Sequence, residues 1–277
     1  MKTKGKVRKI LISFMVCILI IMVLILITVL GYAGNYQYNL IKNEKEIEEI
    51  REQKKEVENP EEKHKNESIT QSQETKESST NSEILEKYKI LYQENSDLIG
   101  WIKIDDTKVD YPVMQTDLDN PIYYINKNWD KEKSFAGLPL LDARCTSNSE
   151  NWIIHSHNMN NGTMFGSLKK YKDYEYYQNH QIIEFDTLYE EASYQIIGVF
   201  QSKYYEEGTA PEGSFLYYDD IELDSEEEFN DYIDNVKKLS LYDTEETAEY
   251  GNQLLTLSTC DKYTEDGRLV IVAKKIQ

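Results

Sequence analysis

The chain has 277 residues, a formal net charge of −19 and 29% charged residues, and this length suits one or two domains. Nucleic-acid-binding proteins need a basic surface, so the acidic balance argues against a nucleic-acid partner. With 40% hydrophobic residues, including 22 Tyr, the chain can bury a substantial core. Only three cysteines occur, so a disulfide framework is not expected, although Cys145 and Cys260 could pair.

The N-terminus combines a basic segment, 1–9, with an uncharged apolar run, 10–31. Roughly 20 apolar residues span the hydrocarbon core of a bilayer as a helix, so we expect one transmembrane anchor. The basic residues favour a cytoplasmic N-terminus, which places the rest of the chain outside the cell. A cleaved signal peptide is the alternative, because small residues occur at 31–34, but its apolar region usually spans only about 7–15 residues.

The composition changes over 32–81, which is charged and then rich in Ser and Thr. Such a segment buries too little apolar surface to offset its ordering entropy, so a solvated helix followed by a flexible stalk is expected. A short coiled coil is the alternative. It rests on a weak heptad spacing of Leu40, Ile47, Ile50 and Val57.

A folded domain is expected at 82–277. It begins with apolar residues at helical spacing, with Ser82 as the expected N-cap; these are Ile84, Leu85, Tyr88 and Leu91. Short strand-like segments with polar loops between most of them follow, and this pattern predicts a closed or nearly closed β-barrel. The expected strands cover 99–104, 108–114, 138–142, 151–157, 181–186, 193–200, 253–259 and 268–276.

Two helices are expected to interrupt the strands. The first follows the turn 160–162, and its apolar side is Met164, Phe165, Leu168 and Tyr171. The second covers 225–239, where Ser225 and Glu228 fit a capping box. Its apolar stripe consists of Phe229, Tyr232, Ile233 and Val236. The acidic run 219–228 could instead be a calcium site, but it lacks the ligand spacing of a calcium loop.

The last two strands place a thiol beside an arginine if they form a hairpin through the loop 261–267. Side chains alternate between the faces of a strand, so Ser258 and Cys260 share one face. If Cys260 lies opposite Arg268, their Cβ atoms are roughly 5 Å apart. A guanidinium there favours the thiolate and can donate to an oxygen that becomes negative. A buried cysteine beside a surface arginine is the alternative.

A cysteine nucleophile also needs a proton-transfer group, which is usually histidine. The chain has four: His64 is in the expected stalk, His180 is in a polar loop, and His155 and His157 end an apolar strand. Alternation puts the last two on one face, yet a zinc site would need further ligands that the sequence does not offer. On spacing alone, either His155 or His157 could be a structural histidine.

The motifs at these positions resemble those of the sortases, the cysteine transpeptidases of Gram-positive cell surfaces. The stretch "TLSTC", 256–260, matches the TLxTC signature of that family, and Arg268 matches the arginine that opens its next strand. The stretch "HNM" matches the segment with the family's histidine, which makes it His157 rather than His155. The segments 97–126 and 134–145 look like the family's N-terminal strands, so the resemblance covers about 82–277.

The resemblance implies a mainly β fold, a sortase-like closed barrel of about eight strands. A helix before the barrel and another before the cysteine strand are similar to class B. The implied catalytic residues are His157, Cys260 and Arg268, with no metal and no organic cofactor. Ser258 would line the substrate groove or make only a cross-strand hydroxyl contact. Two features depart from the pattern: Ser156 stands where the family commonly has Gly, and Cys145 adds a thiol without a role.

The implied function is cleavage of a C-terminal sorting signal on secreted proteins through a thioacyl-enzyme. An amine of a cell-wall precursor, a lipid-linked peptidoglycan unit, would then accept the acyl group at the outer face of a single-pass membrane anchor. Class B leans towards anchoring a small set of surface proteins, often linked to haem or iron uptake. The alternatives are a cysteine endopeptidase that uses water, a pilin-polymerising sortase, and a membrane-tethered binding module without activity.

Overall fold

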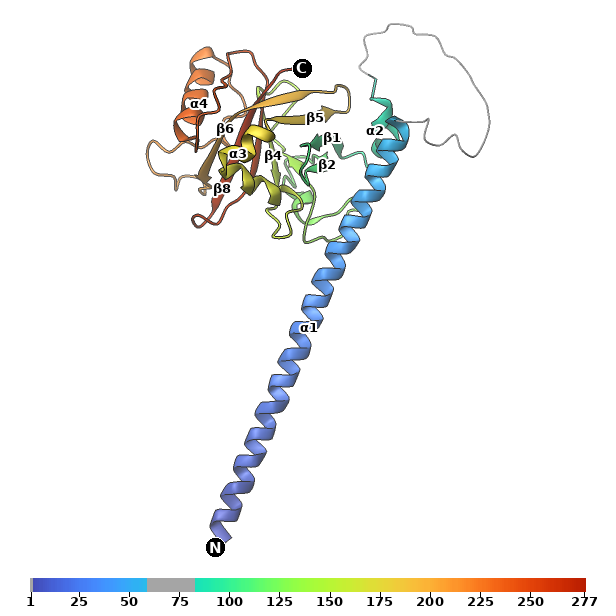
Figure 1. Ribbon diagram of the computed structural model, residues 1–277, viewed down its shortest axis with the longest axis vertical. Helices are drawn as coiled ribbons and strands as arrows, with labels where there is room; N and C mark the ends of the chain where they lie inside the picture. The colour runs from blue at the N-terminus through green and yellow to red at the C-terminus, as the bar shows by residue number, and fades with distance from the viewer. Residues whose placement is uncertain (1, 59–82) are drawn as a thin grey trace, which may run out of the picture. The chain divides into compact units, whose positions relative to one another are not determined.

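The computed structural model describes residues 2–58 and 83–277, so the expected N-cap Ser82 lies outside the described residues (Figure 1). Contacts divide the chain into two compact units, one ending at Lys45 and the other spanning Glu46–Gln277. The helix α1 (Lys2–Glu58) supplies all of the first unit that is described. Its segment Phe14–Glu58 has a window with a mean hydropathy of 3.2. By length and composition, this helix can cross a membrane.

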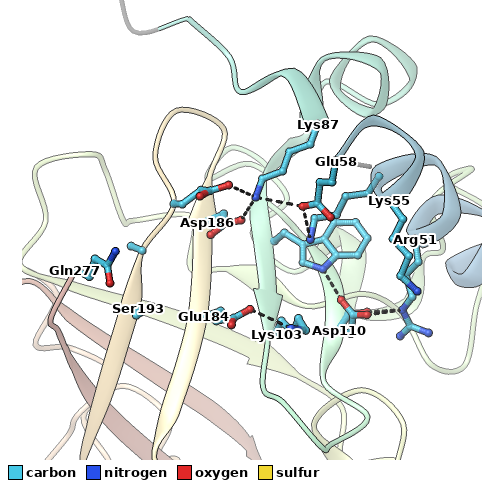
Figure 2. A pocket seen from close by; sticks show the side chains of 14 residues that line it. Arg51, Lys55, Glu58, Lys87, Lys103, Asp110, Glu184, Asp186, Ser193 and Gln277 are labelled. Carbon is cyan, nitrogen blue, oxygen red and sulfur yellow. Dashed lines mark hydrogen bonds and ion pairs between the residues drawn. The ribbon is translucent and has the colours of Figure 1, made fainter. Parts of the chain in front are cut away.

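The last turns of α1 belong to the second unit and pack on the barrel (Figure 2). Ile47 and Ile50 are buried there, with 1% and 4% of their surfaces exposed. Arg51 Nε donates to the Asp110 carbonyl at 2.8 Å, and its guanidinium pairs with the Asp110 carboxylate at 3.4 Å. Residues 46–58 are therefore helical, as expected for the first part of the segment 32–81, but they pack on the barrel, whereas the sequence predicts a solvated helix. The other expected domain boundaries stay predictions.

Ionic and aromatic contacts surround a cavity of about 510 Å³ beside this end of α1. Lys54 Nζ lies 5.0 Å from the centre of the Trp101 ring, and Trp101 Nε1 donates to Asp110 at 2.7 Å. Lys87 lies 2.8 Å from Asp186 and 3.4 Å from Glu58. The cavity wall therefore carries charges of both signs that are paired with each other, which attaches the helix to the barrel.

The second unit is a closed eight-stranded barrel with the order β1-β2-β3-β4-β7-β8-β6-β5. All eight strands expected from the sequence are present, and the closed-barrel prediction is confirmed. The pairs β2–β3 and β4–β7 are parallel, and the other pairs are antiparallel. The strands are β1 (Leu98–Lys103), β2 (Asp110–Met114), β3 (Leu140–Leu141), β4 (Asn151–Ser156), β5 (Ile182–Thr187), β6 (Ser193–Lys203), β7 (Leu254–Cys260) and β8 (Gly267–Lys275).

Short helices connect and cover the strands. The helix α2 (Glu86–Glu94) precedes the barrel, as expected, but Leu85 is its N-cap, so the helix begins later than an N-cap at Ser82 would require and Ile84 lies before it. The helix expected after 160–162 is instead the 3-10 helix η3 (Phe165–Lys172), followed by α3 (Tyr174–Asn179). Its winding is tight because the Gly166 amide donates to the Thr163 carbonyl three residues earlier. The 3-10 helix η2 (Tyr123–Asn126) lies between β2 and β3.

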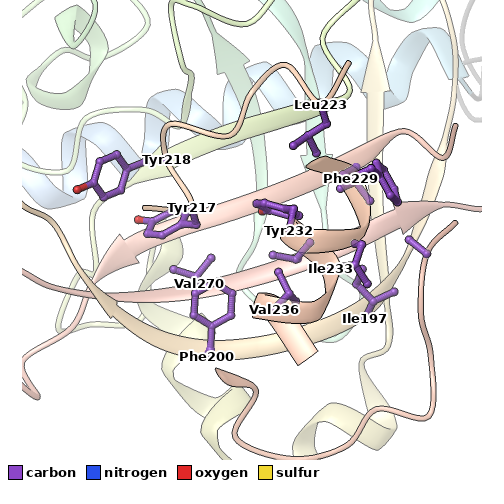
Figure 3. Packing of buried hydrophobic residues seen from close by; sticks show 13 residues of the cluster. Ile197, Phe200, Tyr217, Tyr218, Leu223, Phe229, Tyr232, Ile233, Val236 and Val270 are labelled. Atoms are coloured by element: carbon purple, nitrogen blue, oxygen red, sulfur yellow. The ribbon is translucent and has the colours of Figure 1, made fainter. Parts of the chain in front are cut away.

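The helix α4 (Glu226–Leu239) has the expected capping box at Ser225 and Glu228. It packs against β6 and buries its apolar stripe in a cluster with residues of β6, β7 and β8 (Figure 3). The stripe consists of Phe229, Tyr232, Ile233 and Val236. Tyr232 places its hydroxyl 3.1 Å from Thr256 Oγ1 on β7. The helix thereby reaches the outer face of β7 at Thr256, and the same face carries Ser258 and Cys260 at alternate positions.

Candidate active site

The thiol of Cys260 stands at the exposed end of an otherwise buried strand. Every other residue of β7 is buried, whereas Cys260 is exposed. Arg268, the second residue of β8, is its direct cross-strand partner. The pairing expected from side-chain alternation is therefore confirmed. Gly267 permits this hairpin, because a Cβ at that position would clash with the carbonyl oxygen of Asp261.

His157 follows the end of β4, next to the end of the cysteine strand. The strands β4 and β7 run parallel, with His155 opposite Ser258 and Ser156 opposite Thr259. The His157 carbonyl accepts a hydrogen bond from the Phe165 amide at 3.0 Å. Parallel pairing thus carries residues 157 and 260 to the same edge of the barrel.

The side chain of Asn158 joins the two strand ends directly. Its Nδ2 donates to the carbonyl oxygen of Cys260 at 2.8 Å. Asn158 also forms an isolated bridge with Met164, which closes the turn that follows His157. Sequence reasoning gave Asn158 no role of its own, although it lies in the "HNM" stretch.

A cleft of about 810 Å³ brings the expected residues together on the surface of the barrel. Leu118 and Ile122 line it with side chains that are 66% and 64% exposed. Its polar and aromatic lining residues include His157, Cys260, Arg268, Ser258, Tyr204 and Tyr217. The cleft therefore combines a thiol, an imidazole and a guanidinium with apolar walls.

Burial sets the charge state of two groups in this region. It lowers the pKa of His157 below its usual 6.5, and a hydrogen bond with the Ile125 backbone opposes this effect. Burial also raises the pKa of Cys145 to about 12, so that thiol stays protonated at neutral pH. All three cysteines are free, so the structure does not contain the Cys145–Cys260 disulfide left open by the sequence.

Two tyrosines that the sequence did not single out contact the expected site residues. The hydroxyl of Tyr217 lies 2.7 Å from Ser258 Oγ in a buried hydrogen bond. Burial raises the pKa of Tyr217 to about 12, although Ser258 and the charge of Arg268 both lower it. The Arg268 guanidinium lies 5.5 Å from the centre of the Tyr204 ring. Both tyrosines come from the connection between β6 and α4, which has no sequence signal for a site.

The departure from the family pattern at Ser156 has a local consequence. Its hydroxyl is buried and lacks a hydrogen-bond partner within the described part of the chain. Its carbonyl accepts from Thr259 Oγ1 at 2.8 Å. Ser156 therefore contributes to the pairing of β4 with β7 through its backbone rather than through its hydroxyl.

The acidic run 219–228 brings Glu222 and Asp224 close to Glu150. The ligand atoms of these three carboxylates all lie within 4.8 Å of one another. Glu222 accepts a hydrogen bond from Ser149 Oγ at 2.7 Å, and Glu150 accepts one from the Leu223 amide at 3.1 Å. Donors of the chain itself thus occupy two of the three carboxylates, and the group adds no specific support for the calcium alternative.

Comparison with known proteins identifies the architecture that carries this cleft. A family model described as the Sortase domain matches residues 102–276. This chain belongs to the sortase family. Sortase B of Listeria monocytogenes serovar 1/2a is 32% identical over 203 residues, which cover 72% of this chain and 78% of that protein. Sortase B of Staphylococcus aureus is 26% identical over 202 residues, with the same two shares of 72% and 78%.

The solved structures agree with this assignment. The crystal structure of Bacillus anthracis sortase B in complex with AAEK2 superimposes with a TM-score of 0.67 at 30% identity. The match covers 86% of this chain and 97% of that one. The similarity to class B sortases expected from the sequence is confirmed. As a member of this family the chain is a sortase-type cysteine transpeptidase, which disfavours the inactive binding module.

We expect the imidazole of His157 to titrate below pH 6.5 in the folded chain. Because the folded state then binds this proton more weakly than the unfolded chain, His157 favours folding above pH 6.5, and this contribution is lost as the pH falls. The midpoint can be measured by NMR on the full chain in detergent, with the signal assigned by His157→Gln.

The urea-unfolded chain is the control, and its histidines should titrate near the ordinary value of about 6.5. A folded-state midpoint for His157 at or above the unfolded one would show that an interaction favouring the imidazolium outweighs burial.

Proposed function

We propose that this protein is a membrane-anchored extracellular sortase of class B. It cleaves the C-terminal sorting signal of secreted proteins and transfers them to an amine of a cell-wall precursor. The observation that carries the proposal is the direct pairing of the exposed Cys260 with Arg268 in a cleft that His157 also lines. A nucleophile, a proton-transfer group and a cationic donor are the three groups that acyl transfer requires.

In the first half of the reaction, the Cys260 thiolate attacks the carbonyl carbon of the scissile peptide bond. The proton that the Cys260 thiol loses passes to His157, and when the carbon–nitrogen bond breaks His157 gives this proton to the leaving amine. The product is a thioester between Cys260 and the secreted protein. The exposed position of Cys260 supports this role, because the sulfur is accessible to a peptide in the cleft.

In the second half, the amine of the acceptor attacks the thioester carbonyl. His157 takes a proton from this amine, and the carbon–sulfur bond breaks to release Cys260. The lowered pKa of His157 supports this step, because the neutral imidazole is the form that accepts a proton. Neither half requires a metal or an organic cofactor.

We assign Arg268 to the oxygen that becomes negative in both tetrahedral intermediates. A guanidinium presents several donors in a fixed plane, so it can hold a substrate carbonyl and the oxyanion together. Loss of a single donor of this kind costs about 3–4 kcal/mol in other enzymes. Ser258 lines the same cleft, and we assign it to the wall of the substrate groove together with Tyr217.

The N-terminal helix supports the proposed location. Five basic residues precede its apolar run in the sequence, and positive charge is retained on the cytoplasmic side of a membrane. We therefore place the N-terminus in the cytoplasm and the barrel outside the cell. The secreted substrates and the lipid-linked acceptor would both be present on that side.

The proposal predicts that an amine changes the products. Full-length protein in detergent is incubated with a peptide library, with and without triglycine, and the products are identified by mass spectrometry. Because the thioester can react with an amine, triglycine should become joined to the N-terminal fragment of the cleaved peptides. Cys260→Ala should abolish cleavage, whereas Cys145→Ala should keep most of it, since Cys145 is buried away from solvent.

Two outcomes would contradict the proposal. Cleavage that yields only the free acid in the presence of triglycine would favour a cysteine endopeptidase that uses water. Normal cleavage by folded Cys260→Ala would remove the thiol from the mechanism altogether.

Arg268→Lys tests the role of the guanidinium. Lysine keeps the positive charge but lacks the planar fork, so we expect cleavage to fall by a factor of about 100 or more. The rate is measured on the purified variant after its fold has been checked by circular dichroism. Near-normal turnover would mean that Arg268 only supplies charge near the thiol, and would overturn its assignment to the oxyanion.

A further inference from the structure

An aspartate and an arginine after β3 form a closely bonded pair at the wall of the cleft. Arg144 Nε and Nη2 each donate to the Asp142 carboxylate at 2.9 Å, and the Arg144 amide donates to it at 3.0 Å. His155 Nε2 lies 3.3 Å from the same carboxylate. Burial raises the pKa of Asp142, but the bonds with His155 and Arg144 outweigh burial and hold it below its usual range.

The same guanidinium reaches a distant part of the chain. Arg144 Nη2 donates to the Tyr218 carbonyl at 2.6 Å, and Nη1 lies 3.4 Å from Asp219. These residues belong to the connection 204–225 between β6 and α4, which lines one side of the cleft. Arg144 therefore joins the end of β3 to this connection by a charge-assisted hydrogen bond.

Residues of the connection 204–225 contact β7 and β8, the strands that carry Cys260 and Arg268. Tyr217 precedes Tyr218, whose carbonyl accepts the bond from Arg144, and its hydroxyl lies 2.7 Å from Ser258 on β7. The Tyr218 hydroxyl accepts a hydrogen bond from the Tyr205 amide at 3.1 Å, which closes the connection on itself. Tyr204, at its start, lies under the guanidinium of Arg268. Tyr218 is thus linked through its neighbour Tyr217 to Ser258 on β7, and through Tyr205 and the adjacent Tyr204 to Arg268 on β8.

We propose that Arg144 is a positioning residue that clamps the connection 204–225 onto β3 and so fixes the shape of the donor-peptide groove. This inference rests on the proposed function, because it concerns the groove of the same site. Arg144 itself does not touch the thiol; it acts through Tyr218 and Tyr217. Asp142 orients the guanidinium, since its side chain is only 15% exposed and accepts three bonds from Arg144.

The geometry requires an arginine rather than any cation. One edge of the guanidinium meets the Asp142 carboxylate with two parallel bonds, and the remaining donors face Tyr218 and Asp219. A lysine has a single ammonium and lacks this fork, so it cannot reproduce the bidentate contact and the second bond together. The clamp is therefore testable by a substitution that preserves charge.

The test compares Arg144→Gln with the same substitution in another arginine–aspartate pair of the second unit. Arg51→Gln is the control, because Arg51 pairs with Asp110 and lines a cavity that shares no residue with the cleft. Both variants are made in the full chain in detergent. Amide exchange is measured over 204–219, together with KM and kcat for a cleaved peptide and the rate of Cys260 alkylation by iodoacetamide.

For Arg144→Gln we expect about tenfold faster exchange over 204–219, because the bonded connection opens locally more often. KM should rise by about tenfold, the scale of one lost charge-assisted hydrogen bond. Alkylation of Cys260 should stay within about twofold, because the thiol does not contact Arg144. Arg51→Gln should leave all these quantities near those of the unsubstituted chain, and Arg144→Lys should lie between the two.

The proposal is overturned if Arg144→Gln folds and matches Arg51→Gln in both exchange and KM. If Arg144→Gln does not fold, Arg144→Lys decides, and unchanged exchange and KM in that variant contradict the clamp. The exchange measurement needs no turnover. An unsubstituted chain that cleaves no peptide would therefore count against the proposed function, while the exchange over 204–219 would still support or contradict the clamp.

Discussion

The pairing of β7 with β8 is the constraint on which the rest of the candidate active site depends. Cross-strand partners share one face of a sheet, so the register that puts Cys260 opposite Arg268 also places their two side chains next to each other on that face. The same register buries all of β7 except its last residue. A shift by one residue would turn Cys260 into the barrel and expose Thr259, because side chains alternate along a strand. The tight hairpin that ends at Gly267 and the layer of α4 residues on β7 both oppose such a shift.

Closure of the barrel brings His157 close to Cys260 and Arg268. Because β4 and β7 are parallel neighbours, their ends meet at one edge, and His157 lies beside the end of the cysteine strand. Asn158 strengthens this junction by donating to the Cys260 carbonyl. The connection 204–225 completes the site from the other side through Tyr204 and Tyr217. The strands thus hold the three proposed catalytic groups, while the longer connection 204–225, bonded to Arg144, lines the same cleft.

Much of this arrangement follows from local sequence patterns, and the remainder depends on contacts between distant segments. Short apolar segments with turn residues between them predict the eight strands, and the alternation of side chains between the two faces of a strand predicts the register at Cys260. Both patterns are properties of residues that are neighbours in the sequence. The packing of Ile47 and Ile50 on the barrel is not predicted, since a polar segment with few apolar residues resembles a solvated helix until its partner surface is known. Arg144 is missed for the same reason: its partner Tyr218 lies 74 residues further along the chain. The 3-10 winding of η3 also escapes prediction, because helical apolar spacing fits both kinds of helix.

The central claim is that the thiol opposite Arg268 carries the acyl group during turnover. The most direct measurement is peptide mapping by mass spectrometry of the full chain, mixed with a cleavable peptide and quenched in acid within seconds. The account predicts that the mass of the N-terminal peptide fragment appears on the segment containing Cys260. It also predicts that hydroxylamine removes this mass, as expected for a thioester. An adduct on Cys145, on a residue other than cysteine, or on no residue while cleavage proceeds would contradict the account.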